Sequence, residues 1–299
     1  MKDEKAFQNV FGTTCDRKLE VLKNFKTQDL IDAQNIHGAT VLMFEAQEGH
    51  NESVKLLYFA GANVNLQSDK GNTAIMCAAH SGHLETVKLL ILCEAEVNAT
   101  NSKGNTSLII AAQDGYTDIV QLLCKNEADV NFQNKKGETA LIFAVAHNRT
   151  DVVEMLLKYE ADVNLTNANE NTPLMWAAQH NNEEMANALL KKGAKVNLQD
   201  KEGNTALITA VYAKHPKMIN FLLDHRADKT IRNNDGKTAV DLAKESSNTE
   251  MMQLLCYEVA DINPQNNDML LEHVDVGVEA ACSGAVDALG ATLKVDDTY

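Results

Sequence analysis

The sequence predicts an all-α solenoid, a row of stacked helix pairs built from one unit that repeats along the chain. A phrase that starts at Gly71, GNTAIMCAAHSGHLETVKLL, recurs from Gly104 as GNTSLIIAAQDGYTDIVQLL. Each phrase reads as two short helices of roughly two or three turns, which are marginal in water on their own. Because neither helix can bury its apolar face alone, the unit must stack against copies of itself.

Two columns of the repeat keep their register from unit to unit without an insertion. The turn glycine recurs at multiples of the interval from Gly71 to Gly104, and its positions are Gly38, Gly71, Gly104, Gly137, Gly203 and Gly236. Glu170 occupies the one position of this series that lacks glycine. Just after this slot, all seven units carry threonine in the same register: Thr40, Thr73, Thr106, Thr139, Thr172, Thr205 and Thr238. Threonine in all seven units and glycine in six of them, both in one register, are not expected by chance.

Each element of the unit at residues 71–103 follows from its own residues. Gly71 predicts a turn, because glycine takes a positive φ at no steric cost. Thr73 suits a helix N-cap, where its hydroxyl accepts a bond from a free backbone N–H. AIMCAAHS predicts a short helix that ends at Gly82, and its alanines let another helix come close. LETVKLLILC predicts a second helix with one apolar face, and AEVNATNSK predicts the loop to the next turn.

The repeat resembles a known family. The patterns G-x-T-[AP]-L-x-x-A-A, GH-x-[ED]-x-V-x-L-L and A-[DE]-V-N recur together at one constant period. They are similar to the ankyrin repeat, whose unit is about 33 residues long. The resemblance covers residues 19–268 and implies antiparallel helix pairs, β-hairpin fingers between units, and a curved stack with a concave face. Glu170 departs from the pattern, and we expect it to strain the finger at residues 167–171.

The chain divides into three regions. Residues 1–37 are predicted to form an N-terminal capping region, because the ends of a solenoid need polar caps. Seven repeats follow over residues 38–268, at 38–70, 71–103, 104–136, 137–169, 170–202, 203–235 and 236–268. Residues 269–299 are predicted to form an acidic C-terminal helix and tail.

Charge and composition narrow the choice of partners. The net charge is −15, and the stretch from Glu245 to Tyr299 carries −10 of it, with eleven acidic residues against Lys294 alone. Such a chain is a poor match for nucleic acid or for an anionic membrane surface. The N-terminus lacks the apolar stretch of a signal peptide, and the six cysteines form no CxxC motif. We therefore expect a cytoplasmic protein, with neither nucleic acid nor membrane among its partners.

The sequence contains no recognisable catalytic or cofactor motif. GxSxG, P-loop, HExxH and Gly-rich dinucleotide patterns are missing. Cys77 and Cys124 occupy columns that are apolar in other units, which indicates small buried hydrophobes. His80 and His83 have a spacing that can suit a metal, but His83 shares its repeat column with His50, which favours a structural role. We therefore predict no enzyme activity, no catalytic residue, no metal site and no cofactor.

The function is expected on side chains that vary while the scaffold repeats. In the ankyrin family, the fingertips and one exposed column of the first helix usually contact partners. The resemblance therefore implies a protein-binding site on the concave face and at one fingertip, composed of Phe44, Ile110, Phe143, His147, Trp176, His180 and Tyr212, with Lys135 and Lys136. Tryptophan and tyrosine are favoured at binding hot spots. The alternative is that Phe143 and Trp176 only pack against neighbouring helices.

Two other functions stay open at this point. The acidic C-terminal segment predicts a regulatory or self-associating module, in which that segment masks a basic surface. The same scaffold also suits an effector that is exported into a host cell. A protein–protein interaction module that binds an unknown partner protein without catalysis is the interpretation that the sequence favours.

One modification is also implied by the resemblance. Ankyrin repeats with a leucine eight residues before an asparagine and an aspartate two residues before it can be substrates of an asparaginyl hydroxylase in animal cells. The corresponding positions here are Asn98, Asn131 and Asn164. The alternative is that each asparagine bonds its own finger loop.

Overall fold

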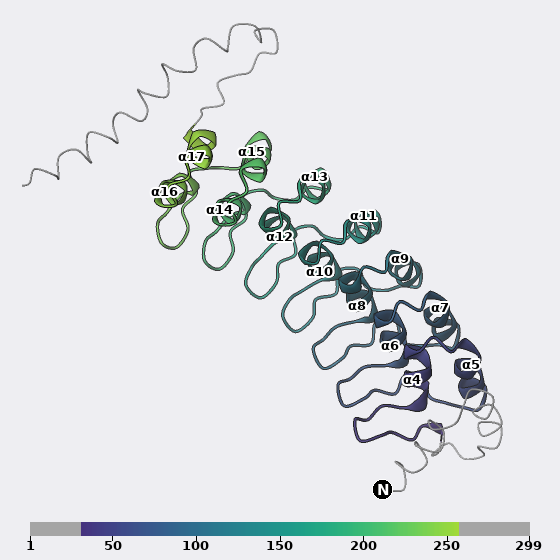
Figure 1. Cartoon of the computed structure of the whole chain (residues 1–299). Coiled ribbons are helices and arrows are strands. Elements are labelled where there is room, and N and C mark those ends of the chain that lie inside the picture. Colours follow the sequence, from purple (N-terminus) through teal and green to yellow (C-terminus); the bar gives the residue numbers. More distant parts are fainter. Residues whose placement is uncertain (1–30, 257–299) are drawn as a thin grey trace, which may run out of the picture. The chain divides into compact units, whose positions relative to one another are not determined.

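The computed structural model describes residues 31–256, which form seven helix pairs in a single row (Figure 1). The first helices of the pairs are α4 (Val41–Gln47), α6 (Ala74–His80), α8 (Ser107–Asp114), α10 (Ala140–Ala146), α12 (Pro173–Gln179), α14 (Ala206–Tyr212) and α16 (Ala239–Glu245). The second helices are α5 (Asn51–Phe59), α7 (Leu84–Leu92), α9 (Thr117–Lys125), α11 (Thr150–Lys158), α13 (Glu183–Lys191), α15 (Pro216–Asp224) and α17 (Thr249–Cys256). The predicted all-α repeat solenoid is confirmed. Most of the predicted capping region at 1–37, and all of the C-terminal segment at 269–299, lie outside the described residues.

The threonine column starts every first helix, as predicted. In α8 the Thr106 hydroxyl accepts a bond of 3.3 Å from the Ile109 backbone N–H, which satisfies one free donor of the first turn. Equivalent bonds cap five further first helices. Thr73 is the exception: it occupies the N-cap of α6, but its buried hydroxyl has no hydrogen-bond partner among the described residues. The predicted cap bond is therefore wrong at that one position.

One continuous core runs through the row. The alanines of the first helices are fully buried and let those helices approach closely, while a leucine column fills the space beneath the second helices. That column is Leu57, Leu90, Leu123, Leu156, Leu189 and Leu222, each with no exposed surface. Neighbouring first helices pack more closely than neighbouring second helices. The row of described units therefore bends toward its first helices, and we call this side, together with the fingers, the concave face.

The fingers are turns that are tied to one another at their tips. The backbone N–H of Ser102 donates to the Lys70 carbonyl at 2.9 Å, and that of Lys135 donates to the Lys103 carbonyl at 3.2 Å. Among the described residues, the only strand-like pairing is an isolated antiparallel bridge between Gln34 and Thr40. The fingers are therefore held mainly by these tip-to-tip bonds between units.

A glutamine column adds a second tie between units. The Gln133 side-chain amide donates to the Gly137 carbonyl of its own finger and to the Thr166 carbonyl of the next, both at 2.9 Å. Gln34, Gln67 and Gln199 repeat this arrangement. One side chain thus fixes the spacing of two fingers at once.

The last described unit carries a charged cap where interior units are apolar. The Asp241 carboxylate accepts bonds from the Thr238 backbone N–H at 3.1 Å and from the Thr238 hydroxyl at 2.9 Å. The backbone bond, followed by the hydroxyl bond, holds the pKa of Asp241 below its usual value. This capping box begins α16 at a position where a solenoid needs a polar end.

Glu170 adopts the backbone conformation of the glycines that it replaces. Its φ is +62°, close to the +71° of Gly137, and its N–H still donates to the Asn167 carbonyl at 2.8 Å. The finger keeps its tip bond as well, since Ala168 donates to the Lys136 carbonyl. The turn therefore keeps its shape and is strained in energy, because a residue with a Cβ loses about 1–2 kcal/mol in this region.

We predict that Glu170→Gly raises the free energy of unfolding by about 0.5–1 kcal/mol, because the relieved strain exceeds the added entropy of the unfolded chain. Urea denaturation measured by circular dichroism tests this. Gly137→Ala is the matched control: its new Cβ would lie 3.0 Å from the Ala168 nitrogen at a positive φ, so stability should fall. Equal or lower stability of Glu170→Gly would show that the turn holds no strain.

Candidate protein-binding face

The predicted binding residues lie along the first helices, at the edge where their buried surface meets the concave face. Phe44, Ile110, Phe143 and Trp176 are half-buried, in α4, α8, α10 and α12 respectively. Their neighbours on the same helices, such as the alanines, are fully buried. These four side chains therefore each contribute one face to the core and one face to the surface.

Two of these aromatic rings carry a histidine stacked on them. The Phe143 and His147 rings lie 5.9 Å apart at an angle of 24°, and those of Trp176 and His180 lie 6.3 Å apart at 18°. Both histidines are exposed and follow the last residue of their helices. Consecutive units thus repeat the same flat plate, with helix axes spaced by about 8–10 Å. We call these four residues the aromatic patch.

Trp176 has an unsatisfied donor. Its indole nitrogen is buried and has no hydrogen-bond partner among the described residues. A buried indole N–H normally finds an acceptor, and leaving a buried donor unpaired costs about 1–3 kcal/mol. The same column holds Phe44, Cys77, Ile110 and Thr209 in other units, so the scaffold does not require tryptophan. The scaffold therefore gives no structural reason for the unpaired donor of Trp176.

Tyr212 lies one unit beyond the patch and contacts the finger that leads into α16. Its side chain is 51% exposed, and the Asn233 side-chain amide donates to its hydroxyl at 3.3 Å. Close by, the Lys237 ammonium pairs with Glu245 at 2.7 Å, a bond that raises the pKa of Lys237. Tyr212 therefore belongs to a polar cluster at the start of α16, next to the aromatic patch.

A side-chain hydrogen bond between neighbouring first helices was missed by the sequence analysis. The His80 imidazole lies 2.8 Å from the Asp114 carboxylate and joins α6 to α8. The two residues are 34 positions apart, one more than the repeat period. Comparison of equivalent positions in successive repeats does not reveal such a pair. The pair is found when each position is compared with the residue that follows its equivalent in the next repeat.

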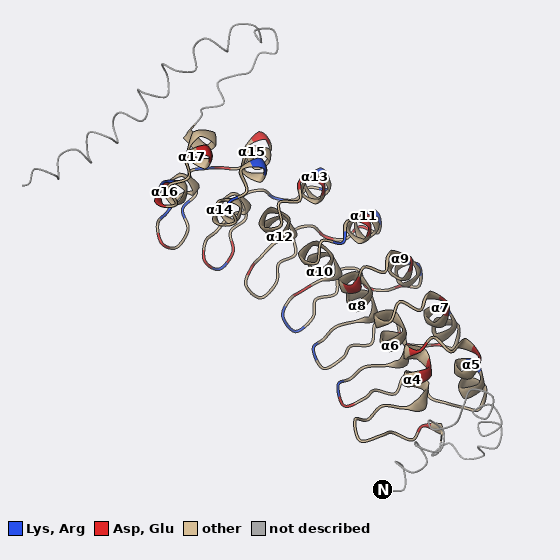
Figure 2. Cartoon of the chain, in the orientation of Figure 1, with Lys and Arg blue, Asp and Glu red and all other residues tan. Residues whose placement is uncertain are grey.

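The lysines at the fingertips form a row. Lys135 and Lys136 are exposed at the tip of one finger, and Lys70 and Lys103 occupy the column of Lys136 in the two preceding units. Figure 2 shows these three fingers with basic tips. The predicted binding site included only Lys135 and Lys136 of this row, although Lys70 and Lys103 occupy the same position of the repeat as Lys136.

Phe44 lines a separate hollow at the other end of the concave face. This hollow has a volume of about 450 Å³ and lies between α4, α6 and the first two fingers. Its apolar floor and polar rim are formed by Ala39, Met43, Phe44 and Cys77, with His37, Gln47, Ser68, Asp69, Lys70 and Asn72. The structure therefore separates Phe44 from the aromatic patch by the units of α6 and α8.

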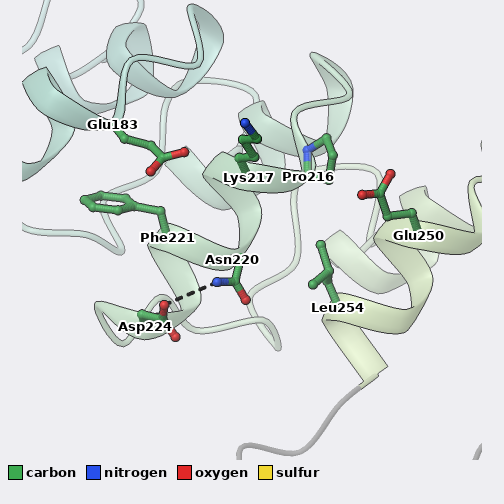
Figure 3. Close-up of a pocket in the computed structure, with 8 residues that line it drawn as sticks. All are labelled: Glu183, Pro216, Lys217, Asn220, Phe221, Asp224, Glu250 and Leu254. Atoms are coloured by element: carbon green, nitrogen blue, oxygen red, sulfur yellow. Dashed lines mark hydrogen bonds between the residues drawn. The ribbon is translucent and has the colours of Figure 1, made fainter.

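A second hollow, of about 380 Å³, lies among the second helices α13, α15 and α17 (Figure 3). Asn220 donates to Asp224 at 3.3 Å, and Glu183 and Glu250 extend from the helices on either side. Its acidic groups are spread over three helices, and within residues 31–256 no three His, Cys, Asp or Glu side chains gather closely enough to hold a metal ion. This hollow therefore offers no convergent chemistry.

The thiols of Cys77 and Cys124 are poor nucleophiles. Burial raises the pKa of Cys77 to about 11. Burial also raises the pKa of Cys124 to about 11, because its effect is larger than that of a backbone hydrogen bond that lowers this pKa. Very little thiolate exists at neutral pH, and thiolate is the reactive form.

In the described part of the chain, no helix has the length and apolar character needed to cross a membrane.

The asparagines named for hydroxylation tie neighbouring units together. The Asn98 amide donates to the Glu127 carbonyl and accepts from the Asp129 N–H, both at 2.9 Å. Asn131 accepts from Asp162 at 2.8 Å, and Asn164 makes both kinds of bond to the unit after its own. The expectation that each asparagine bonds its own finger loop is therefore wrong, since the partners belong to the next unit. Hydroxylation at these positions stays a prediction.

We predict that iodoacetamide at pH 7.5 modifies Cys256, which is exposed, well before Cys77 and Cys124. Modification of the two shielded thiols should accelerate as the pH rises toward 11, because the thiolate fraction then grows. Peptide mass spectrometry after timed quenching measures each site, and the chain unfolded in guanidinium is the control in which all three react alike. Equal rates for Cys77 and Cys256 in the folded chain would contradict the shielding.

Comparison with known protein families covers the whole of this surface. A family model described as ankyrin repeats (3 copies) matches residues 42–134 and 126–200, and one described as ankyrin repeats (many copies) matches residues 189–243. No curated protein matches the sequence. Every candidate binding residue from Phe44 to Tyr212 lies within the matched stretch.

Proposed function

Because the chain belongs to the ankyrin-repeat family, whose repeats are generally protein–protein interaction modules, we propose that it binds a partner protein through the concave face, with Trp176 as the central contact. Ankyrin-repeat proteins are typically non-catalytic, and we propose the same for this chain. The partner would cover about 800 Å² of this face, which corresponds to roughly three to five units.

The unpaired indole of Trp176 is the observation that carries the proposal. A buried donor without an acceptor is a cost that the fold itself does not offset. A partner that supplies a carbonyl or carboxylate after a small rotation of the ring would remove this cost in the complex only. The gain would add directly to the binding free energy, in the manner of a hot spot.

The neighbours of Trp176 complete the proposed site. The plates of Phe143 with His147 and of Trp176 with His180 offer flat apolar surface to a partner, and exposed histidine nitrogens offer hydrogen bonds at its rim. The Lys135 and Lys136 fingertip stands at the finger that leads into α10. Tyr212 extends the surface by one unit.

We predict that Trp176→Ala weakens partner binding by about 30-fold or more, equivalent to about 2 kcal/mol, and that Phe143→Ala weakens it further. The partner is first captured from a lysate of the source cell and then titrated against the purified chain. Trp176 is the only tryptophan, so its fluorescence reports on the site directly.

Phe221→Ala is the matched control. Phe221 also carries a histidine four residues on, with ring centroids 4.3 Å apart, but it lies in α15 among the second helices. This variant should keep full affinity. Unchanged affinity of a folded Trp176→Ala chain would remove Trp176 from the site.

A further inference from the structure

We propose that units 38–136 carry a second binding surface, which takes an extended acidic segment of a partner protein with one large apolar side chain. The surface combines the hollow beside Phe44 with Lys70, Lys103, Lys135 and Lys136, which we call the lysine row. It rests on the proposed function in the premise that the partner is a protein, and it shares with that site only the fingertip of Lys135 and Lys136. Its residues are separate from the aromatic patch, so the two can be tested independently.

The spacing of the lysine row is fixed by the backbone. The carbonyls of Lys70, Lys103 and Lys136 each accept the tip bond from the next finger, at 2.9, 3.2 and 2.6 Å. Each successive finger therefore carries one lysine of this column, and Lys135 adds a further charge beside Lys136. In the described part of the chain, none of these four ammonium groups forms an ion pair, and Asp69 is the single acidic residue at these three tips.

This local charge is opposite to that of the whole chain. Four positive charges and one negative charge stand together on a protein with a net charge of −15. The net charge of the chain repels an acidic partner at long range, so such a partner is attracted only where its acidic groups lie close to this row. The row therefore selects an acidic segment by its position as well as by its sign.

The hollow lies at one end of the row, and Lys70 belongs to both. Its floor of Met43, Phe44 and Cys77 is apolar, and its volume of about 450 Å³ is enough for a leucine or aromatic side chain. Lys70 on the rim places a positive charge directly beside that side chain. When the apolar side chain of a bound segment occupies this hollow, the acidic residue beside it lies close to Lys70. The following acidic residue of the segment then meets Lys103 on the next finger.

The geometry also sets the pattern of the segment. Successive units are about 8–10 Å apart, and an extended chain rises about 3.3 Å per residue. An acidic residue at about every third position would therefore meet one lysine of the column after another. Nucleic acid fits less well, because Asp69 stands at the rim of the hollow and phosphate binding needs a larger basic surface.

The test uses the full chain and a designed probe. The probe is a fluorescein-labelled peptide with one Phe followed by Glu at every third position, with Gly and Ser between, and its binding is measured by fluorescence anisotropy. We expect binding that weakens steeply between 50 and 300 mM salt, and that falls at least 10-fold when Lys replaces Glu or Ala replaces Phe in the peptide. A peptide series without these differences would overturn the proposal.

Charge reversal in the protein locates the site. Lys103→Glu/Lys135→Glu/Lys136→Glu should weaken peptide binding at least 10-fold. The matched control reverses Lys125, Lys158 and Lys191, an exposed column on the second helices that recurs once per unit as the lysine row does, and should leave binding unchanged. Equal loss in both triple variants, each with an unchanged melting temperature, would show a general charge effect and overturn the site.

Trp176→Ala separates this proposal from the proposed function. The variant should bind the peptide as tightly as the wild-type chain, because the aromatic patch lies outside units 38–136. A captured partner that is lost with Trp176→Ala, together with absence of peptide binding, would overturn only the lysine row. Peptide binding that is lost with Trp176→Ala would overturn the claim of a second surface.

Discussion

The structure depends on one constraint: no unit of this chain can bury its own helices. Each unit offers two short helices whose apolar faces remain open until a neighbour covers them, so stability arises at the interfaces between units. The fully buried leucine column and the close-packed alanines of the first helices meet that requirement. The uninterrupted repeat period meets the same requirement, because it places equivalent residues at every interface between units.

The polar ties follow from this constraint as well. Glutamine and asparagine side chains bond the backbone of the next unit, and the fingertips bond one another through their main chains. The fingertip bonds recur between all neighbouring fingers of the described residues, and the side-chain bonds recur at several of these interfaces, which fixes the distance between equivalent residues along the row. Side chains that do not take part in packing are thereby held at regular intervals on one face, and this makes the face suitable for recognising an extended surface.

The sequence was sufficient for the fold because period and register are one-dimensional properties. The glycine and threonine columns alone place all first helices, and the exception at Thr73 changes a bond without changing the helix. The site was only partly predictable, since its contacts join columns that differ by one residue between units, as His80 and Asp114 do. The missing acceptor of Trp176 and the hollow beside Phe44 depend on side-chain placement in three dimensions, which no column reveals.

Two departures from the local rules fall in the same unit, although other units also contain an unpaired buried hydroxyl, at Thr73, and non-glycine residues at positive φ, such as Glu94. Glu170 holds a positive φ in a slot made for glycine, and Trp176, on the helix that follows, leaves a buried donor unpaired. Each lowers the stability of a unit whose neighbours show that a less strained residue fits. Real proteins tend to break local rules where function requires it. The finger that leads into this unit is bonded to the end of the lysine row, since the Ala168 N–H donates to the Lys136 carbonyl, and the first helix of this unit carries half of the aromatic patch. The unit at 170–202 is thus the place where the two surfaces meet. A partner that contacts both surfaces would cover this junction, where Glu170 and Trp176 carry their energetic costs.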